Sequence, residues 1–108
     1  MARIEIDADS EVFTLINLFN VEPKNQQELI TTLKGGAETL LSKQPGYLSA
    51  AIHRSQDGRH AVVYSQWRSA EDFQAVRTNP AVQQYFARVR DIATFEPIGY
   101  DVTYVDRV

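Results

Sequence analysis

The sequence predicts an α+β fold, in which one four-stranded antiparallel sheet carries helices on one of its faces. Three observations lead to this prediction. The spacing of apolar residues switches several times between the two-residue period of strands and the 3.6-residue period of helices. Asp57-Gly58, between two strand-like segments, is the strongest short-range hairpin signal. Helix-start patterns precede two further segments, so the order is β-α-β-β-α-β, the split βαβ arrangement of ferredoxin-like folds.

The first strand and the first helix follow from residues 12–46. Residues 12–21 (VFTLINLFNV) are rich in β-branched and aromatic residues and stop before Glu22-Pro23, which predicts a strand. Asn25 and Glu28 have the spacing of a capping box, so we expect a helix to begin there and to end at Pro45-Gly46. Its apolar stripe consists of Leu29, Leu33, Ala37, Leu40 and Leu41. Gly35-Gly36 weakens the middle of the helix by about 1 kcal/mol per glycine.

Residues 47–55 and 60–68 form the predicted hairpin around Asp57-Gly58. With a two-residue loop, the numbers of paired residues sum to 115, and His53 and Trp67 then lie on opposite faces of the sheet. A three-residue loop reverses that relation. The sequence leaves both registers open.

The second helical region and the last strand complete the order. Ser69 to Asp72 resembles a capping box with Asp in place of Glu, and Asn79-Pro80 interrupts the helix and starts a new one. Residues 98–105 alternate between Ile98, Tyr100, Val102, Tyr104 and the intervening residues, which predicts a half-buried last strand.

Apolar residues on both faces of the strands predict a homodimer. In the first strand Phe13, Leu15 and Phe19 have one parity, and Ile16 and Leu18 have the other. Helices cover only one face, so the other face is expected to expose a large apolar surface, which soluble monomers rarely do. We therefore expect two copies to pack sheet on sheet.

Composition limits the classes of function. A chain of 108 residues supports one domain, residues 1–108, of which residues 1–11 are expected to form an N-terminal arm. The net charge of −3 argues against nucleic-acid binding, and no apolar run is long enough to span a membrane. The sequence contains no cysteine, which excludes disulfides, thiolate metal sites and cysteine nucleophiles. We expect a cytoplasmic protein.

Few residues suggest chemistry on their own. His53 and His60 have no carboxylate at a metal-ligand spacing, so a metal site is disfavoured, and His53 remains a candidate ligand contact or a structural histidine. Hydrolase, nucleotide and flavin motifs are missing from the sequence. Asn17 is a polar amide within an apolar strand, and its partner is either a structural hydrogen bond or a ligand. The arginines of the second helical region, Arg77, Arg88 and Arg90, are interpreted as a solvated face.

Three segments resemble a known family. They are residues 45–50 (PGYLSA), 53–58 (HRSQDG) and 62–73 (VVYSQWRSAEDF), and they are similar to the antibiotic biosynthesis monooxygenase family of small dimeric α+β barrel proteins. The resemblance extends from about Thr14 to Val105. It implies an oxygenase that acts on an aromatic polyketide or similar phenol with dioxygen and uses no cofactor. A deprotonated phenolic substrate can itself reduce dioxygen, so the protein has only to bind, orient and stabilise it.

The resemblance also implies roles for individual residues. Trp67 matches a tryptophan that lines the family's pocket, while Asn17 and His53 match polar residues of some members and are the expected catalytic set. The substrate is expected to contact Val63, Tyr64, Phe73 and Phe86 as well.

The sequence departs from the family's pattern at three of these positions. Val63 stands where several oxygenases carry an asparagine, Phe73 replaces a tyrosine, and Phe86 lies near an arginine or, in haem-degrading relatives, a haem-ligating histidine. Haem degradation is therefore not expected. The alternative hypothesis is a non-oxidative protein of the same fold: a polyketide-binding or cyclase-like auxiliary protein, or a stress-related small-molecule-binding protein.

Overall fold

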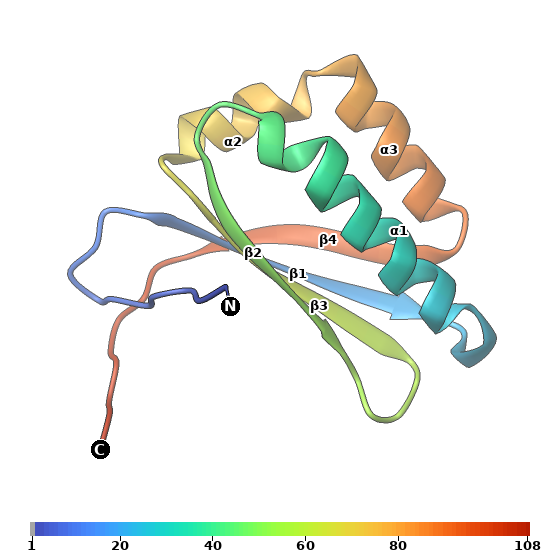
Figure 1. Ribbon diagram of the computed structural model, residues 1–108, viewed down its shortest axis with the longest axis horizontal. Helices are drawn as coiled ribbons and strands as arrows, with labels where there is room; N and C mark the ends of the chain where they lie inside the picture. Colours follow the sequence, from blue (N-terminus) through green and yellow to red (C-terminus); the bar gives the residue numbers. More distant parts are fainter. Residues whose placement is uncertain (1) are drawn as a thin grey trace.

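The computed structural model describes residues 2–108, which form a four-stranded antiparallel sheet with helices on one side (Figure 1). The strands are β1 (Phe13–Val21), β2 (Tyr47–Arg54), β3 (His60–Trp67) and β4 (Ala93–Tyr100). The α-helices are α1 (Gln26–Thr39), α2 (Ala70–Arg77) and α3 (Pro80–Arg90). Two short 3-10 helices, η1 (Pro23–Asn25) and η2 (Leu41–Lys43), flank α1. The strand order is β2-β3-β1-β4, so the predicted ferredoxin-like α+β fold is confirmed.

The hairpin register decides which side chains face the helices. His53 pairs with Val62 and Ile52 pairs with Val63, so the register is the one expected for a two-residue loop. Only near the start of β2 does the register shift, where Tyr47 pairs with Trp67. Because successive strand residues point to opposite faces, Trp67 lies on the helix side and His53 lies on the opposite side.

Two of the three helix starts follow the local signals. The Ser69 side chain accepts a hydrogen bond from the Asp72 backbone N–H, and Asn79 accepts one from the Ala81 N–H before Pro80 begins α3. The expected capping box at Asn25 is wrong. Asn25 precedes α1, but its side chain makes no capping hydrogen bond, because η1 already leads the chain into the helix in a helical conformation.

The last strand lies five residues earlier than the alternation predicted. β4 runs from Ala93 to Tyr100 because its partner β1 fixes its position: Val21 pairs with Ala93 and Thr14 pairs with Tyr100. Beyond Tyr100, residues 101–108 pair with no strand among residues 2–108, although their apolar pattern alternates. β4 is an edge strand, which is why it tolerates Pro97 without an N–H.

The buried core lies between the sheet and the helices. Leu29 of α1, Val89 of α3 and Phe19 of β1 are almost completely buried. No helix among residues 2–108 combines the length and apolar character that a membrane crossing requires.

The side of the sheet without helices, called the open face below, exposes apolar side chains. Leu18 on the central strand β1 is 48% exposed, and Ile98 on the edge strand β4 is 46% exposed. One contact between the segment before β1 and the sheet is a hydrogen bond that the Gln66 side chain donates to the Glu5 carbonyl.

Candidate functional site

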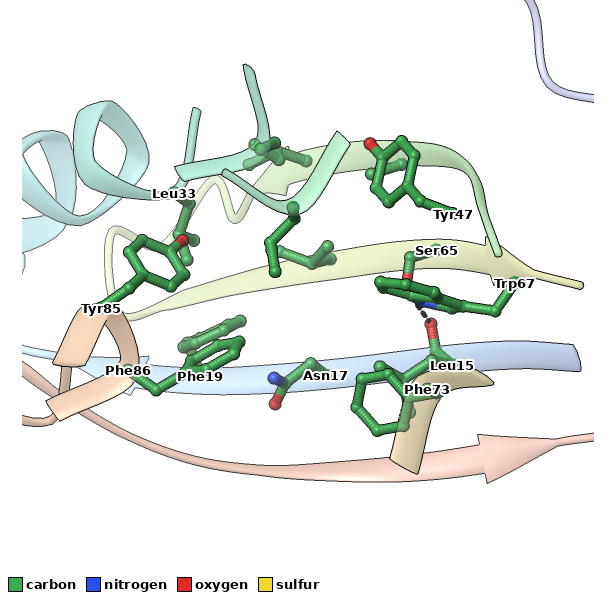
Figure 2. A pocket seen from close by; sticks show the side chains of 15 residues that line it. Leu15, Asn17, Phe19, Leu33, Tyr47, Ser65, Trp67, Phe73, Tyr85 and Phe86 are labelled. Atoms are coloured by element: carbon green, nitrogen blue, oxygen red, sulfur yellow. Dashed lines mark hydrogen bonds between the residues drawn. The ribbon is translucent and has the colours of Figure 1, made fainter. Parts of the chain in front are cut away.

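A small apolar cavity lies between the helix side of the sheet and the helices that cover it (Figure 2). Its volume is about 40 Å³. Side chains from β1, β2, β3 and all three α-helices form its walls: Leu15, Asn17, Phe19, Leu33, Ala37, Leu41, Tyr47, Ala50, Ile52, Val63, Ser65, Trp67, Phe73, Tyr85 and Phe86. The cavity is therefore enclosed by rings and aliphatic groups, with few polar atoms available to a ligand.

Asn17 is the polar residue in the central row of this wall. The sheet register places Ile52, Val63, Asn17 and Pro97 side by side across the four strands. Asn17 is only 5% exposed, and its Oδ1 has no hydrogen-bond partner among residues 2–108. Neither strand neighbour can supply one, because the side chains of Val63 and Pro97 are apolar. A buried amide atom without a partner is costly, so this position is a candidate contact for a bound molecule.

Trp67 forms a fixed wall of the cavity. It is 2% exposed, and its Nε1–H donates to the Ser65 hydroxyl at 3.1 Å. The centroid of the Tyr47 ring lies 5.3 Å from that of the indole, in a T-shaped arrangement. The centroid of the Phe73 ring lies 5.4 Å from it, in a tilted arrangement. Because the indole N–H is already bonded within the protein, Trp67 offers a ligand its aromatic surface rather than a donor.

A backbone clamp follows directly after Trp67. The Arg68 N–H donates to the Gly46 carbonyl at 2.7 Å, and the Arg68 side chain bonds the Asp72 carboxylate at the start of α2. Gly46 has a φ of 86°, and a Cβ there would lie 2.5 Å from the Asp72 Cβ, so only glycine fits. The clamp joins the start of β2, the end of β3 and α2 beside the cavity.

The titratable groups of the cavity wall are two tyrosines. Burial raises the pKa of Tyr85 to about 12 and raises the pKa of Tyr47 above its ordinary value. Both phenols are thus neutral at physiological pH and cannot serve as bases. No histidine or carboxylate lines the cavity, and residues 2–108 contain no cluster of three or more such groups that could hold a metal ion.

The structure brings together five of the seven predicted site residues. Asn17, Val63, Trp67, Phe73 and Phe86 all line the cavity, as expected from sequence.

His53 and Tyr64 do not line the cavity. His53 pairs with Val62, and Tyr64 pairs with Ile16, so both side chains belong to the open face. The two-residue alternation of the strands puts both side chains on the face opposite Trp67, which is the relation expected for His53 with a two-residue loop.

The sequence analysis missed Ser65, Tyr47 and Tyr85 as parts of the site. Ser65 stands two residues before Trp67, so its strand parity was a sufficient signal. Tyr85 was recognised only as part of an apolar helix stripe, and nothing in that stripe shows which residue faces the cavity.

Comparisons with known proteins agree on a single family. A family model described as antibiotic biosynthesis monooxygenase matches residues 12–88. Tetracenomycin-F1 monooxygenase of Streptomyces glaucescens is 39% identical over 99 residues, which cover 92% of this chain and 88% of that protein.

Two solved structures share the fold at lower identity. A variant of SnoaB, a cofactor-independent oxygenase from Streptomyces nogalater, has a TM-score of 0.78 at 19% identity and covers 89% of this chain and 97% of its own. The monooxygenase of the ActVA-Orf6 gene of Streptomyces coelicolor, solved with the ligand nanaomycin D, has a TM-score of 0.79 at 22% identity, with coverages of 89% and 91%.

Proposed function

The chain belongs to the antibiotic biosynthesis monooxygenase family, and we propose that it is a cofactor-independent monooxygenase that converts an aromatic polyketide, of the anthrone type, to a quinone. The observation that carries the proposal is the buried Asn17 side chain, whose Oδ1 has no hydrogen-bond partner among residues 2–108, in an apolar cavity walled by Trp67. The 39% identity to a protein named for oxidation of tetracenomycin F1 supports the substrate class.

The reaction requires the protein only to bind the substrate and to stabilise the enolate with a polar group. Loss of a proton from the reactive CH₂ group gives an electron-rich enolate, which transfers one electron to dioxygen. The resulting radical and superoxide combine at the same carbon to form a hydroperoxide, and loss of water leaves the carbonyl group. Overall, one CH₂ group and one O₂ give one C=O group and one H₂O.

Asn17 is the group proposed to stabilise the enolate. Its amide can donate a hydrogen bond to the developing oxyanion, and such a bond is stronger in an apolar cavity than in water. Tyr47 and Tyr85 are neutral, so neither takes the proton of the substrate, and the proton passes to water instead. Trp67 and Phe73 would hold the flat ring system by contact with their faces.

We further propose that the protein acts as a homodimer that packs open face against open face. Leu18 and Ile98 expose apolar surface there. A second sheet would cover these apolar side chains.

One observation favours a second candidate function, which is ligand binding without oxidation. Val63 adjoins Asn17 in the sheet and adds no hydrogen bond to the central row, so a single amide is available to polarise a substrate there. A polyketide-binding or cyclase-like protein needs no more than this.

Oxygen uptake by purified, chelator-treated protein with emodinanthrone separates the two functions. We expect uptake and quinone formation to exceed the buffer rate and to scale with protein concentration. Binding of the anthrone without any acceleration of oxygen uptake would contradict the monooxygenase proposal and favour the second function.

A further inference from the structure

A second hollow, called the β4 cleft here, lies beside the cavity. Its volume is about 240 Å³, and it is bounded by β1 and β4 on one side and by α2 and α3 on the other. Its lining includes Asn17, Phe73, Arg77, Phe86, Arg90 and Phe95. Leu15, Asn17, Phe73 and Phe86 line both the cavity and the β4 cleft, so the two hollows adjoin.

Asn17 is the polar residue that lines both hollows. Figure 2 shows its amide between the Phe86 side and the Phe73 side of the site, at the boundary that the cavity shares with the cleft. Because Asn17 lines both hollows, a molecule in either one can contact it.

The β4 cleft is positively charged although the chain is acidic overall. The net charge of the chain is −3, yet the charged residues of the cleft lining are Arg77 and Arg90, with no carboxylate among them. Neither arginine forms a salt bridge within residues 2–108. Two cations without acidic partners leave the cleft available to an anion.

Both guanidinium groups lie over aromatic rings of the cleft. The Arg77 Cζ lies 5.9 Å from the Phe73 ring centroid, and the Arg90 Cζ lies 4.9 Å from the Phe95 ring centroid. Contact with a ring face holds each side chain near the cleft and leaves its N–H donors free. The sequence interpretation of these arginines as a solvated face is thus incomplete.

Size indicates that a polycyclic ligand needs both hollows. Sites for drug-sized molecules are roughly 300–1,000 Å³. The β4 cleft and the cavity together approach the lower end of that range, whereas the cavity alone is far below it.

We propose that the substrate is an anionic polycyclic aromatic that lies across both hollows, with its reacting ring beside Asn17 and a carboxylate substituent bound by Arg77 and Arg90. This inference rests on the proposed function and specifies its substrate class. Arginine suits the role because its planar set of donors matches the two oxygens of a carboxylate.

Two matched probes test the charge requirement without any turnover. Anthraquinone-2-carboxylate and anthraquinone-2-carboxamide share a ring system but differ in charge, and both can be titrated by quenching of the fluorescence of Trp67, the only tryptophan. We expect the carboxylate to bind about tenfold more tightly, the effect of one charge-assisted hydrogen bond. The preference should decrease as salt is added.

Substitutions at three arginines locate the effect. Arg77→Gln and Arg90→Gln should each reduce the preference, and the double variant should abolish it. Arg88→Gln removes the same charge from an exposed position of α3 outside the cleft lining and should leave the preference unchanged. All three positions are exposed, so the variants are expected to fold.

Several results would overturn the inference: no binding of the carboxylate probe, equal affinity for the two probes, a preference that survives in the double variant, or an equal loss in Arg88→Gln. The outcome is independent of the oxygen-uptake assay. A charge preference that maps to Arg77 and Arg90 without oxygen uptake would sustain the anion site and reject the monooxygenase.

Discussion

Asn17 and Asn20 stand three residues apart on β1, yet they belong to opposite faces of the same sheet. Asn17 points to the helix side and is 5% exposed between apolar neighbours, whereas Asn20 is exposed on the open face. Leu15 and Leu18 differ in the same way, at 7% and 48% exposed. The comparison shows that residue type alone assigns no role in this sheet. Strand parity decides whether a side chain meets the cavity or the open face.

The largest effect is expected from charges placed on the open face. Leu18→Lys combined with Ile98→Lys would bury unpaired ammonium groups between two sheets, and we expect the dimer dissociation constant to rise by at least about 10³-fold. Sedimentation equilibrium across a dilution series measures it. Gln84→Lys with Ala87→Lys adds the same charge to exposed positions of α3 and serves as the control. Equal dissociation of both double variants, or a monomeric parent protein, would refute open-face packing.

A smaller but specific effect is expected from the two asparagines. Asn17→Ala removes the amide from the cavity and should lower kcat/KM for the anthrone about 100-fold, the usual consequence of losing one oxyanion donor. Asn20→Ala makes the same change on the open face and should leave kcat/KM within about twofold of the parent value. Steady-state oxygen uptake measures both. Equal values for the two variants would show that Asn17 does not act on the substrate.

Gly35 and Gly36 of α1 differ in how much space surrounds them on the helix side of the sheet. A Cβ at Gly36 would collide with the Tyr85 ring, whereas a Cβ at Gly35 meets nothing within 4 Å. Tyr85 is buried and cannot move aside freely, so Gly36→Ala should lower the free energy of unfolding by about 1–3 kcal/mol.

Gly35→Ala is the matched control for this collision. It should raise the free energy of unfolding by about 0.5–1 kcal/mol, because alanine favours the helix. Urea denaturation measures both variants. Stabilisation by Gly36→Ala would mean that Tyr85 does not pack tightly against α1.

The features that sequence predicted well are set by nearby residues. The Ser69 cap and the Asn79-Pro80 helix start each depend on a few consecutive positions. The hairpin register at Asp57-Gly58 was left open between two alternatives, of which the structure has the one for a two-residue loop. β4 was displaced in the prediction because its ends depend on β1, more than 70 residues away in the chain, through pairs such as Val21 with Ala93. The alternation of residues 98–105 is real but has no partner strand within residues 2–108.

The candidate site was partly predictable for the same reason. Asn17 and Trp67 stand out by type within apolar strands, and both line the cavity. The β4 cleft was not predictable, since it requires α3 to lie over β4 so that Arg90 reaches Phe95. His53 was assigned to the site from resemblance, while the register that removes it was left open.

The clamp of Gly46, Arg68 and Asp72 has a consequence for how such a protein can diversify. It fixes the backbone beside Trp67 through a main-chain hydrogen bond and an ion pair, and none of its three residues lines the cavity or the β4 cleft. Substitutions at Val63, Phe73 or Phe86 can therefore reshape the site without loosening the frame that supports it. A lineage with this frame can change its substrate by altering wall residues alone.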